Sequence, residues 1–261
     1  MQIASGVLSV GKVLGLVCLF CVACQKNEPA QGKAPAKPSA EAVEQLVNGG
    51  FEQWEGTGKE VEPVQWNSYM SGTGEGIAYT AGRAQQVAPS DDVCPGSEGV
   101  RSVCIYARSV MGVVANGNLT TGQVHMGSAT ASNTEANYNF TQLNHADFHQ
   151  RLTVKPDSIR FWAKFVCPDA KQYARMSAIV HDAYPVKDPS VQDDLPHIVT
   201  KASLDFQTSK GEWVCYTVPF ENVHSDLSPE YILITFTTNR EPGKGSKSDK
   251  LYVDDVSLMY K

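Results

Sequence analysis

The segment Ser158-Ile-Arg-Phe-Trp-Ala-Lys-Phe-Val166 alternates apolar with mostly polar side chains and decides the fold class. Its apolar side chains at odd positions share one face of an extended chain: Ile159, Phe161, Ala163 and Phe165. Arg160 and Lys164 lie on the opposite face with Trp162, and we expect them to face solvent. The segment therefore predicts an antiparallel strand with one face in a core.

Further runs rich in β-branched and aromatic residues share this character and are bounded by Gly, Pro, Asp or Asn. They are Ser102–Val110, Met176–Val180, Trp213–Phe220, Tyr231–Thr238 and Leu251–Tyr260. After residue 60 no amphipathic helical window of usable length competes with them. We predict an all-β, two-sheet antiparallel β-sandwich of the jelly-roll kind over residues 48–261. Asp182 to His197 is expected to be a long surface loop, and Trp213 a core residue.

The first residues of the chain have the features of an export signal. Lys12 precedes the uncharged run Val13–Ala23, which is too short to span a bilayer and ends in small residues before Cys24. The sequence Cys21-Val-Ala-Cys24 resembles the bacterial lipobox, although Leu is usual where Cys21 stands. The resemblance implies cleavage before Cys24, acylation of that cysteine, and an outer-membrane lipoprotein, periplasmic or surface-exposed. A retained membrane helix and an ordinary secreted protein are the alternatives.

From Gln25 to about Val43 the chain is rich in Pro, Ala, Lys and Gln and contains no aromatic residue. This composition is typical of a flexible tether. The predicted organisation is therefore a signal peptide at 1–23, lipidated Cys24 with its tether at 24–47, and one folded domain at 48–261.

The charge of the protein argues against nucleic acid as a partner. The formal net charge is −6, and no basic run after residue 40 is suited to a phosphate backbone. Charged residues are 19% and apolar residues 42% of the chain, so we expect a globular body.

Four cysteines follow the tether and, outside the cytoplasm, are able to oxidise. Cys94 and Cys104 flank the turn-rich segment Pro95–Gly99, which favours a local disulfide between them. Cys167 and Cys215 would form a second pair or stay free as small apolar side chains.

The two ends of the predicted domain carry distinctive segments, Asn48-Gly-Gly-Phe-Glu52 and Leu251-Tyr-Val-Asp-Asp-Val-Ser-Leu258. Together they resemble the ends of carbohydrate-binding jelly rolls of the galactose-binding-like type. The resemblance implies adjacent first and last strands and a structural calcium ion held by Glu52 and Asp254, with Asn48 or Gly50 as carbonyl donors. The alternative is that the two carboxylates only close the ends through hydrogen bonds.

Segments in the middle of the chain narrow this resemblance: Asn116–Gly122, Ser158–Phe165 and Trp213–Phe220, followed by Leu251–Tyr260. Their order is similar to that in the putative carbohydrate metabolism domain family, found on lipoproteins of Bacteroidetes. Leu152–Pro156 departs from the family, where an Arg-Pro step is expected. The resemblance implies a carbohydrate-related function more weakly than it implies a fold.

Sugar binding needs exposed aromatic faces beside polar groups. The candidates are Trp66, Tyr69, Tyr79 and Trp162, with core packing as the competing explanation for each. No pair of carboxylates stands out as glycosidase machinery, and no Gly-x-Ser-x-Gly motif is present. We expect a cell-surface lipoprotein whose non-catalytic domain captures or organises glycans, with a surface protein complex as a further candidate partner. The alternatives are a glycoside hydrolase or other carbohydrate-active enzyme and a structural or adhesive surface subunit.

Overall fold

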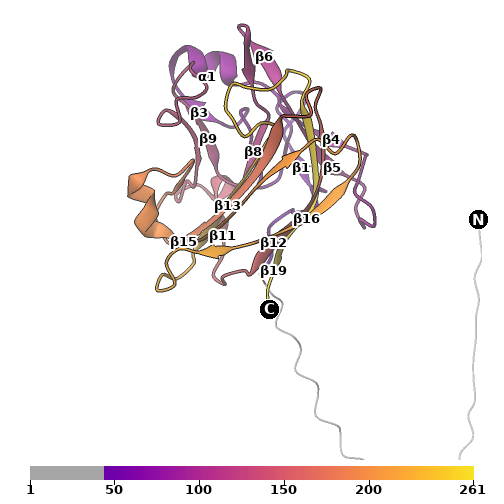
Figure 1. Ribbon diagram of the computed structural model, residues 1–261. Helices are drawn as coiled ribbons and strands as arrows, with labels where there is room; N and C mark the ends of the chain where they lie inside the picture. Colours follow the sequence, from indigo (N-terminus) through magenta and orange to yellow (C-terminus); the bar gives the residue numbers. More distant parts are fainter. Residues whose placement is uncertain (1–43) are drawn as a thin grey trace, which may run out of the picture. The chain divides into compact units, whose positions relative to one another are not determined.

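The segment Ser158–Val166 forms strand β12, near the middle of one of two large sheets that pack face to face (Figure 1). The computed structural model describes residues 44–261. The predicted all-β sandwich is confirmed. The signal peptide 1–23, Cys24 and nearly all of the tether lie outside the described residues.

The first large sheet, called here the β13 sheet, has the order β11-β18-β13-β15-β17, with β8 also paired to β18. Its strands are β8 (Asn118–Thr120), β11 (Gln150–Arg151), β13 (Tyr173–His181), β15 (Ile198–Gln207), β17 (Glu221–Asn222) and β18 (Tyr231–Thr237). The second, called the β12 sheet, has the order β16-β12-β19-β5-β4. Its strands besides β12 are β4 (Val87–Ser90), β5 (Ser102–Tyr106), β16 (Val214–Pro219) and β19 (Lys250–Met259).

Smaller elements surround the β13 sheet and one end of the sandwich. A four-stranded sheet has the order β14-β10-β9-β3, and β1-β2 and β6-β7 form separate strand pairs. These strands are β1 (Trp54–Glu55), β2 (Glu62–Pro63), β3 (Thr73–Gly74), β6 (Arg108–Val110), β7 (Val113–Ala115), β9 (Gln123–Met126), β10 (Asn137–Phe140) and β14 (Lys187–Asp188). The helical elements are α1 (Gly76–Gly82) and the 3-10 turns η1 (Ala146–Phe148) and η2 (Gln192–His197). Among the described residues no helix has both the length and the apolar character needed to cross a membrane.

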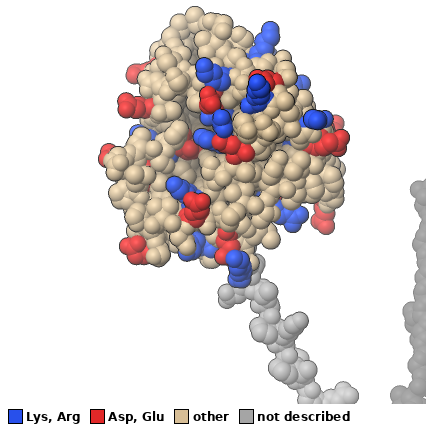
Figure 2. Space-filling model, in the orientation of Figure 1, with Lys and Arg blue, Asp and Glu red and all other residues tan. Residues whose placement is uncertain are grey.

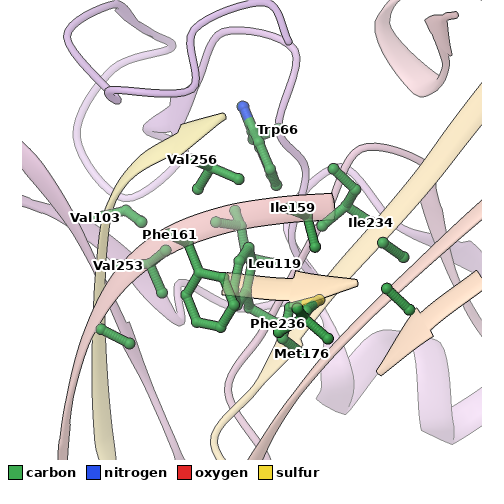
Figure 3. Packing of buried hydrophobic residues seen from close by; sticks show 14 of the residues in the cluster. Trp66, Val103, Leu119, Ile159, Phe161, Met176, Ile234, Phe236, Val253 and Val256 are labelled. Atoms are coloured by element: carbon green, nitrogen blue, oxygen red, sulfur yellow. The ribbon is translucent and has the colours of Figure 1, made fainter. Parts of the chain in front are cut away.

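The core lies between the two large sheets and is built from the inward faces of their strands (Figure 3). The predicted inward face of β12 is confirmed, because Ile159, Phe161, Ala163 and Phe165 are all at most 1% exposed. The ring of Phe161 meets that of Phe236 from β18 edge to face, with centroids 5.2 Å apart. Each such side chain contributes roughly 1.5–3 kcal/mol by leaving water, so this shared layer holds the sandwich together.

The outer face of the β12 sheet is less exposed to solvent than its sequence predicts. Lys164 is only 6% exposed, and its Nζ lies 4.3 Å from the ring centroid of Tyr252 and 5.2 Å from that of Trp213. The ammonium group also pairs with Asp92. The expectation of a solvent-facing Lys164 is wrong, and so is the core position of Trp213, which is half-buried on the outer face.

Several elements differ from the sequence-based expectations. The ten-residue strand β15 and the short helix α1 were not predicted, and strand β13 begins at Tyr173 rather than at Met176. The expected loop from Asp182 to His197 contains strand β14 and the 3-10 turn η2.

The expected adjacency of the first and last strands is not found, because β1 pairs with β2, and β19 lies between β12 and β5. The segment 45–49, which forms no strand, nevertheless lies beside β19. The amide of Val256 in β19 donates to the carbonyl of Gly49 at 2.9 Å, and the side chain of Gln45 exchanges two hydrogen bonds with the backbone of Leu258. A Cβ atom at Gly49 would lie 2.1 Å from the carbonyl oxygen of Val256. Glycine is therefore required at this close approach.

Candidate ligand-binding cavity

A cavity of about 390 Å³ lies over the outer face of the β13 sheet. Its floor comes from the strands themselves, because the inward positions of β13 and β18 alternate with outward polar ones. Arg175 stands opposite Thr237, and Ser177 stands opposite Thr235. Helix α1, the β6–β7 hairpin, strands β9 and β10 and the segment 239–243 form the walls. The volume lies within the roughly 300–1,000 Å³ range of small-molecule sites.

The floor is rich in amide and hydroxyl groups that are held in place by one another. Asn118 donates to Oδ1 of Asn139 at 2.9 Å, and Asn139 donates to the hydroxyl of Thr235 at 3.2 Å. The hydroxyl of Ser177 donates to the carboxylate of Asp188. These contacts fix the side chains in one arrangement, so the floor is organised before any ligand arrives.

Two arginines bring positive charge to the cavity. The guanidinium of Arg175 donates to both oxygens of Asp205, at 2.7 and 3.2 Å, and this pairing raises the pKa of Arg175. Arg240 lies 3.7 Å from the same carboxylate and stacks over Tyr173 at 4.5 Å. The shared carboxylate orients both guanidinium groups and offsets part of their charge.

One buried polar atom in the lining has no partner among the described residues. Asn116 is 8% exposed, and its Nδ2 donates to the carbonyl of Asn239 at 3.2 Å. Its Oδ1 accepts no hydrogen bond. An unpaired buried acceptor costs about 1–3 kcal/mol.

Aromatic groups also line the cavity. Tyr138 stacks on His125 with centroids 4.9 Å apart, and Nζ of Lys187 lies 4.5 Å from the Tyr138 centroid. Burial raises the pKa of Tyr69 to about 12, although Arg108 opposes this, so the phenol stays protonated at neutral pH and is able to donate a hydrogen bond.

The four aromatic residues predicted to bind sugar are not brought together. Tyr69 lines the cavity, whereas Tyr79 lies on α1 outside the lining. Trp162 is half-buried on the β12 sheet and lines a separate, more open hollow together with Gly50 and Asp255. Trp66 is 1% exposed and packs on Phe51 and Phe236, so its predicted role in sugar binding is wrong. The competing explanation, core packing, holds for this residue.

The two carboxylates predicted as calcium ligands bind opposite ends of the same surface loop, residues 94–101. Oε1 of Glu52 accepts hydrogen bonds from the amides of Val100 and Arg101, at 3.0 and 2.9 Å. Asp254 accepts from the amides of Cys94 and Asp255, at 2.9 and 2.8 Å. The arrangement fits the alternative in which these carboxylates close the ends of the domain through backbone donors.

The other predicted calcium donors do not complete an oxygen cage. The side chain of Asn48 bonds to the backbone of Gln53 and Val64, and Gly50 lies near Asp255 rather than beside Glu52. The group of potential ligands that does converge is Cys94, Asp254 and Asp255, within 4.8 Å of one another. Burial raises the pKa of the Cys94 thiol, and burial also raises that of Asp254 to about 6. A protonated thiol among two carboxylates does not suit calcium, which takes six to eight oxygen ligands.

The predicted disulfide between Cys94 and Cys104 is not formed, and Cys167 and Cys215 stay free, which is the second of the two alternatives for them. Cys94, Cys104, Cys167 and Cys215 are all free thiols. The Sγ of Cys94 points to the carboxylate of Asp255, at 3.4 Å, whereas Cys104 lies in β5 opposite Tyr252 of β19. A turn-rich link brings two cysteines near in sequence, but the neighbours of each thiol are set by the sheet and by the 94–101 loop.

Sequence reasoning missed most of the cavity. Its floor and inner wall contain five asparagines, Asn116, Asn118, Asn137, Asn139 and Asn239, which come from segments far apart in the chain. One signal was available, since Asn116-Gly-Asn-Leu-Thr-Thr-Gly122 was recognised as a motif and supplies two of them. The outward positions of β13 and β18 carried no comparable pattern.

Comparison with known proteins supports the fold. No family model and no curated protein matches the chain. A solved structure described as a putative glycoside hydrolase from Bacteroides thetaiotaomicron is 17% identical, with a TM-score of 0.61, over 81% of this chain and 70% of its own. Another putative glycoside hydrolase, from Bacteroides vulgatus, is 14% identical with a TM-score of 0.53, over 85% of this chain and 96% of its own. The chain shares their β-sandwich fold.

At these identities the likeness establishes architecture and no activity. The resemblance to the putative carbohydrate metabolism domain family stays an interpretation of the sequence, because no family model supports it.

Proposed function

We propose that this protein binds glycans without cleaving them, in the cavity over the β13 sheet. The observation that carries the proposal is the fixed polar floor beside Tyr138, in a cavity of about 390 Å³. Sugar hydroxyls take planar amide and guanidinium partners, and the apolar face of a sugar ring stacks on an aromatic ring. Asn118, Arg175 and Arg240 offer the first kind of contact. Tyr138 lines the wall beside them, and a sugar that contacts its ring would share it with His125 and Lys187.

The absence of a carboxylate pair in the lining favours binding over hydrolysis. Asp188 is the one carboxylate among the lining residues of the described part of the chain, and it is hydrogen-bonded to Ser177. Glycoside hydrolysis uses two carboxyl groups about 5–10 Å apart across the scissile bond. The names of the two similar solved structures keep hydrolysis as the alternative to be tested.

The proposed location is the bacterial envelope, with the protein anchored as an outer-membrane lipoprotein. It rests on the lipobox-like sequence before Cys24 and on the tether composition. An anchored domain would hold captured glycans at high local concentration beside neighbouring envelope proteins. Radiolabelled palmitate incorporation that is lost in Cys24→Ala supports the anchor, and unchanged incorporation contradicts it.

Binding is tested by applying the purified full-length protein to a glycan array and measuring affinities for the bound glycans by calorimetry. Tyr138→Ala should weaken binding about twofold to tenfold, which corresponds to the loss of one aromatic contact of about 0.5–1.5 kcal/mol. Tyr79→Ala is the matched control, because Tyr79 is also half-buried but lies outside the lining, and its affinity should equal that of the wild type. Failure to bind any glycan overturns the proposal. Release of shortened products from a bound glycan overturns its non-catalytic part.

A further inference from the structure

Three large apolar side chains are exposed around the mouth of the cavity. An unsubstituted sugar, which presents mainly hydroxyl groups, would make few apolar contacts with them. Ile77 is 60% exposed, Met111 78% and Val113 46%, and all three belong to the cavity lining. A single exposed apolar residue needs no explanation, but several around one cavity mark an interaction site. In Figure 2 the end of the domain where Figure 1 places α1 and β6 is mostly free of charged side chains.

The apolar rim is held in shape before a ligand binds. Met111 and Gly112 form the turn of the β6–β7 hairpin, with φ of 49° and 84°. Arg108 at the base of this hairpin donates to the carbonyl oxygens of Ala81 and Gly82 at the end of α1, at 2.6 and 2.8 Å. The hairpin and α1, which carry the rim residues, are thereby fixed to each other, so little conformational entropy is lost when a ligand contacts them.

The polar and apolar parts of the lining come from different elements. The floor on β8, β13 and β18 is built of amides, hydroxyls and Arg175, whereas the rim on α1 and the hairpin is aliphatic. Asn116 lies next to the end of β7 and belongs to the lining, although its unpaired Oδ1 is buried. A purely apolar ligand would leave the amides, hydroxyls and guanidinium of the floor desolvated without partners. A bare saccharide would leave the rim in water.

We infer that the ligand is a saccharide that carries an apolar substituent, an acyl ester or an aryl group. The inference rests on the proposed function and adds to it the chemical class of the bound ligand. The sugar ring lies over the floor, where its hydroxyls meet the amides of Asn118 and Asn139 and the guanidinium of Arg175. The substituent packs against Met111 and Val113. Methionine suits this role, because its flexible thioether side chain adapts to differently shaped apolar groups.

The test compares p-nitrophenyl and methyl glycosides of glucose, galactose, mannose and xylose, with p-nitrophenol as the sugar-free probe. For the sugar that binds best, the p-nitrophenyl glycoside should bind the full-length protein about tenfold more tightly than the methyl glycoside, which corresponds to burying a small apolar group. The double variant Met111→Gln/Val113→Thr should reduce this advantage to about twofold while leaving the methyl glycoside unaffected.

The matched control is Met259→Gln/Val154→Thr, which makes the same changes at exposed positions outside the cavity lining. It should keep the full advantage. Equal affinities for the two glycosides, or an advantage that survives the rim substitutions, overturn the inference and leave the proposed function standing. Binding of p-nitrophenol as tightly as its glycosides overturns it as well. If no glycoside binds and the glycan array is also blank, the proposed function fails with it.

Discussion

The outer faces of the two large sheets both carry polar side chains, but they are covered in different ways. On the β12 sheet, Lys164 is enclosed by Trp213, Tyr252 and Asp92, and Asp254 is covered by the 94–101 loop. On the β13 sheet the covering elements stand away from the strands and leave a cavity of about 390 Å³.

The difference separates structural polar groups from groups available to a ligand. The carboxylates of Glu52 and Asp254, which resemble a metal site in sequence, bind amides of the 94–101 loop. The floor of the cavity, which had little signature in sequence, faces open space. A polar residue is a candidate for ligand binding when its covering layer leaves room.

The largest effect is expected from a substitution in the core, which lies between the two large sheets. Trp66→Ala should lower the free energy of unfolding by about 3–5 kcal/mol, because it removes a fully buried indole from between Phe51 and Phe236. Urea unfolding followed by circular dichroism measures this change. Unchanged stability together with lost glycan binding would mean that Trp66 binds sugar and is not a core residue, which contradicts the contrast between structural groups and groups available to a ligand.

The next effect contrasts one carboxylate from each face. Asp254→Ala should cost about 2–4 kcal/mol, since it leaves the buried amides of Cys94 and Asp255 without their acceptor. Asp188→Ala, in the cavity, should cost about 1 kcal/mol or less and alter glycan affinity instead. Urea unfolding and calorimetric titration of both variants give the two readouts. Equal stability losses would mean that the two faces do not differ in this way.

A smaller, pH-dependent effect concerns a polar residue on the β13 sheet away from the cavity lining. His181 is fully buried, its Nδ1 donates to the carbonyl of Asp182, and its Nε2 accepts from the hydroxyl of Thr141, both at 2.8 Å. Burial lowers the pKa of His181 from 6.5 to about 4. The unfolded chain therefore binds the proton first, and stability present above pH 6.5 is lost as the pH falls toward 4.

The loss assigned to His181 should be about 2–3 kcal/mol over this window. Subtracting the unfolding free energies of His181→Gln from those of the wild type at each pH isolates it, because all other titrating groups are common to both proteins. A difference that stays constant from pH 7 to pH 4 would show that the buried ring is not kept neutral.

The smallest effect is expected from calcium. Because Glu52 and Asp254 are engaged by backbone donors, millimolar calcium or chelator should shift the unfolding free energy by less than about 0.5 kcal/mol. Thermal unfolding with calcium and with EDTA checks this. A large stabilisation that is lost in Asp254→Asn would restore the calcium site that the sequence resemblance implied.

The sequence predicted most of the large strands, because apolar and polar side chains that alternate along a strand indicate which of its faces packs in a core. Strand β12 follows this alternation over its full length, from Ser158 to Val166. Strand β15 carries the same signal weakly, at Ala202, Leu204 and Phe206, and was missed beside a proline-rich stretch. Helix α1 spans seven residues, too few for a helical period to be recognised.

The sequence by itself determined the fold class and the inward face of β12, because both depend on local periodicity. The proximity of the two ends was implied only by the resemblance to galactose-binding-like jelly rolls. Only the tertiary structure decided that Trp66 and Lys164 are buried and that Cys94 and Cys104 stay apart as free thiols. It also decided that asparagines distant in the chain gather over one sheet. The physical reason is that a side chain's environment is set by what covers its strand, and the covering segments come from elsewhere in the sequence.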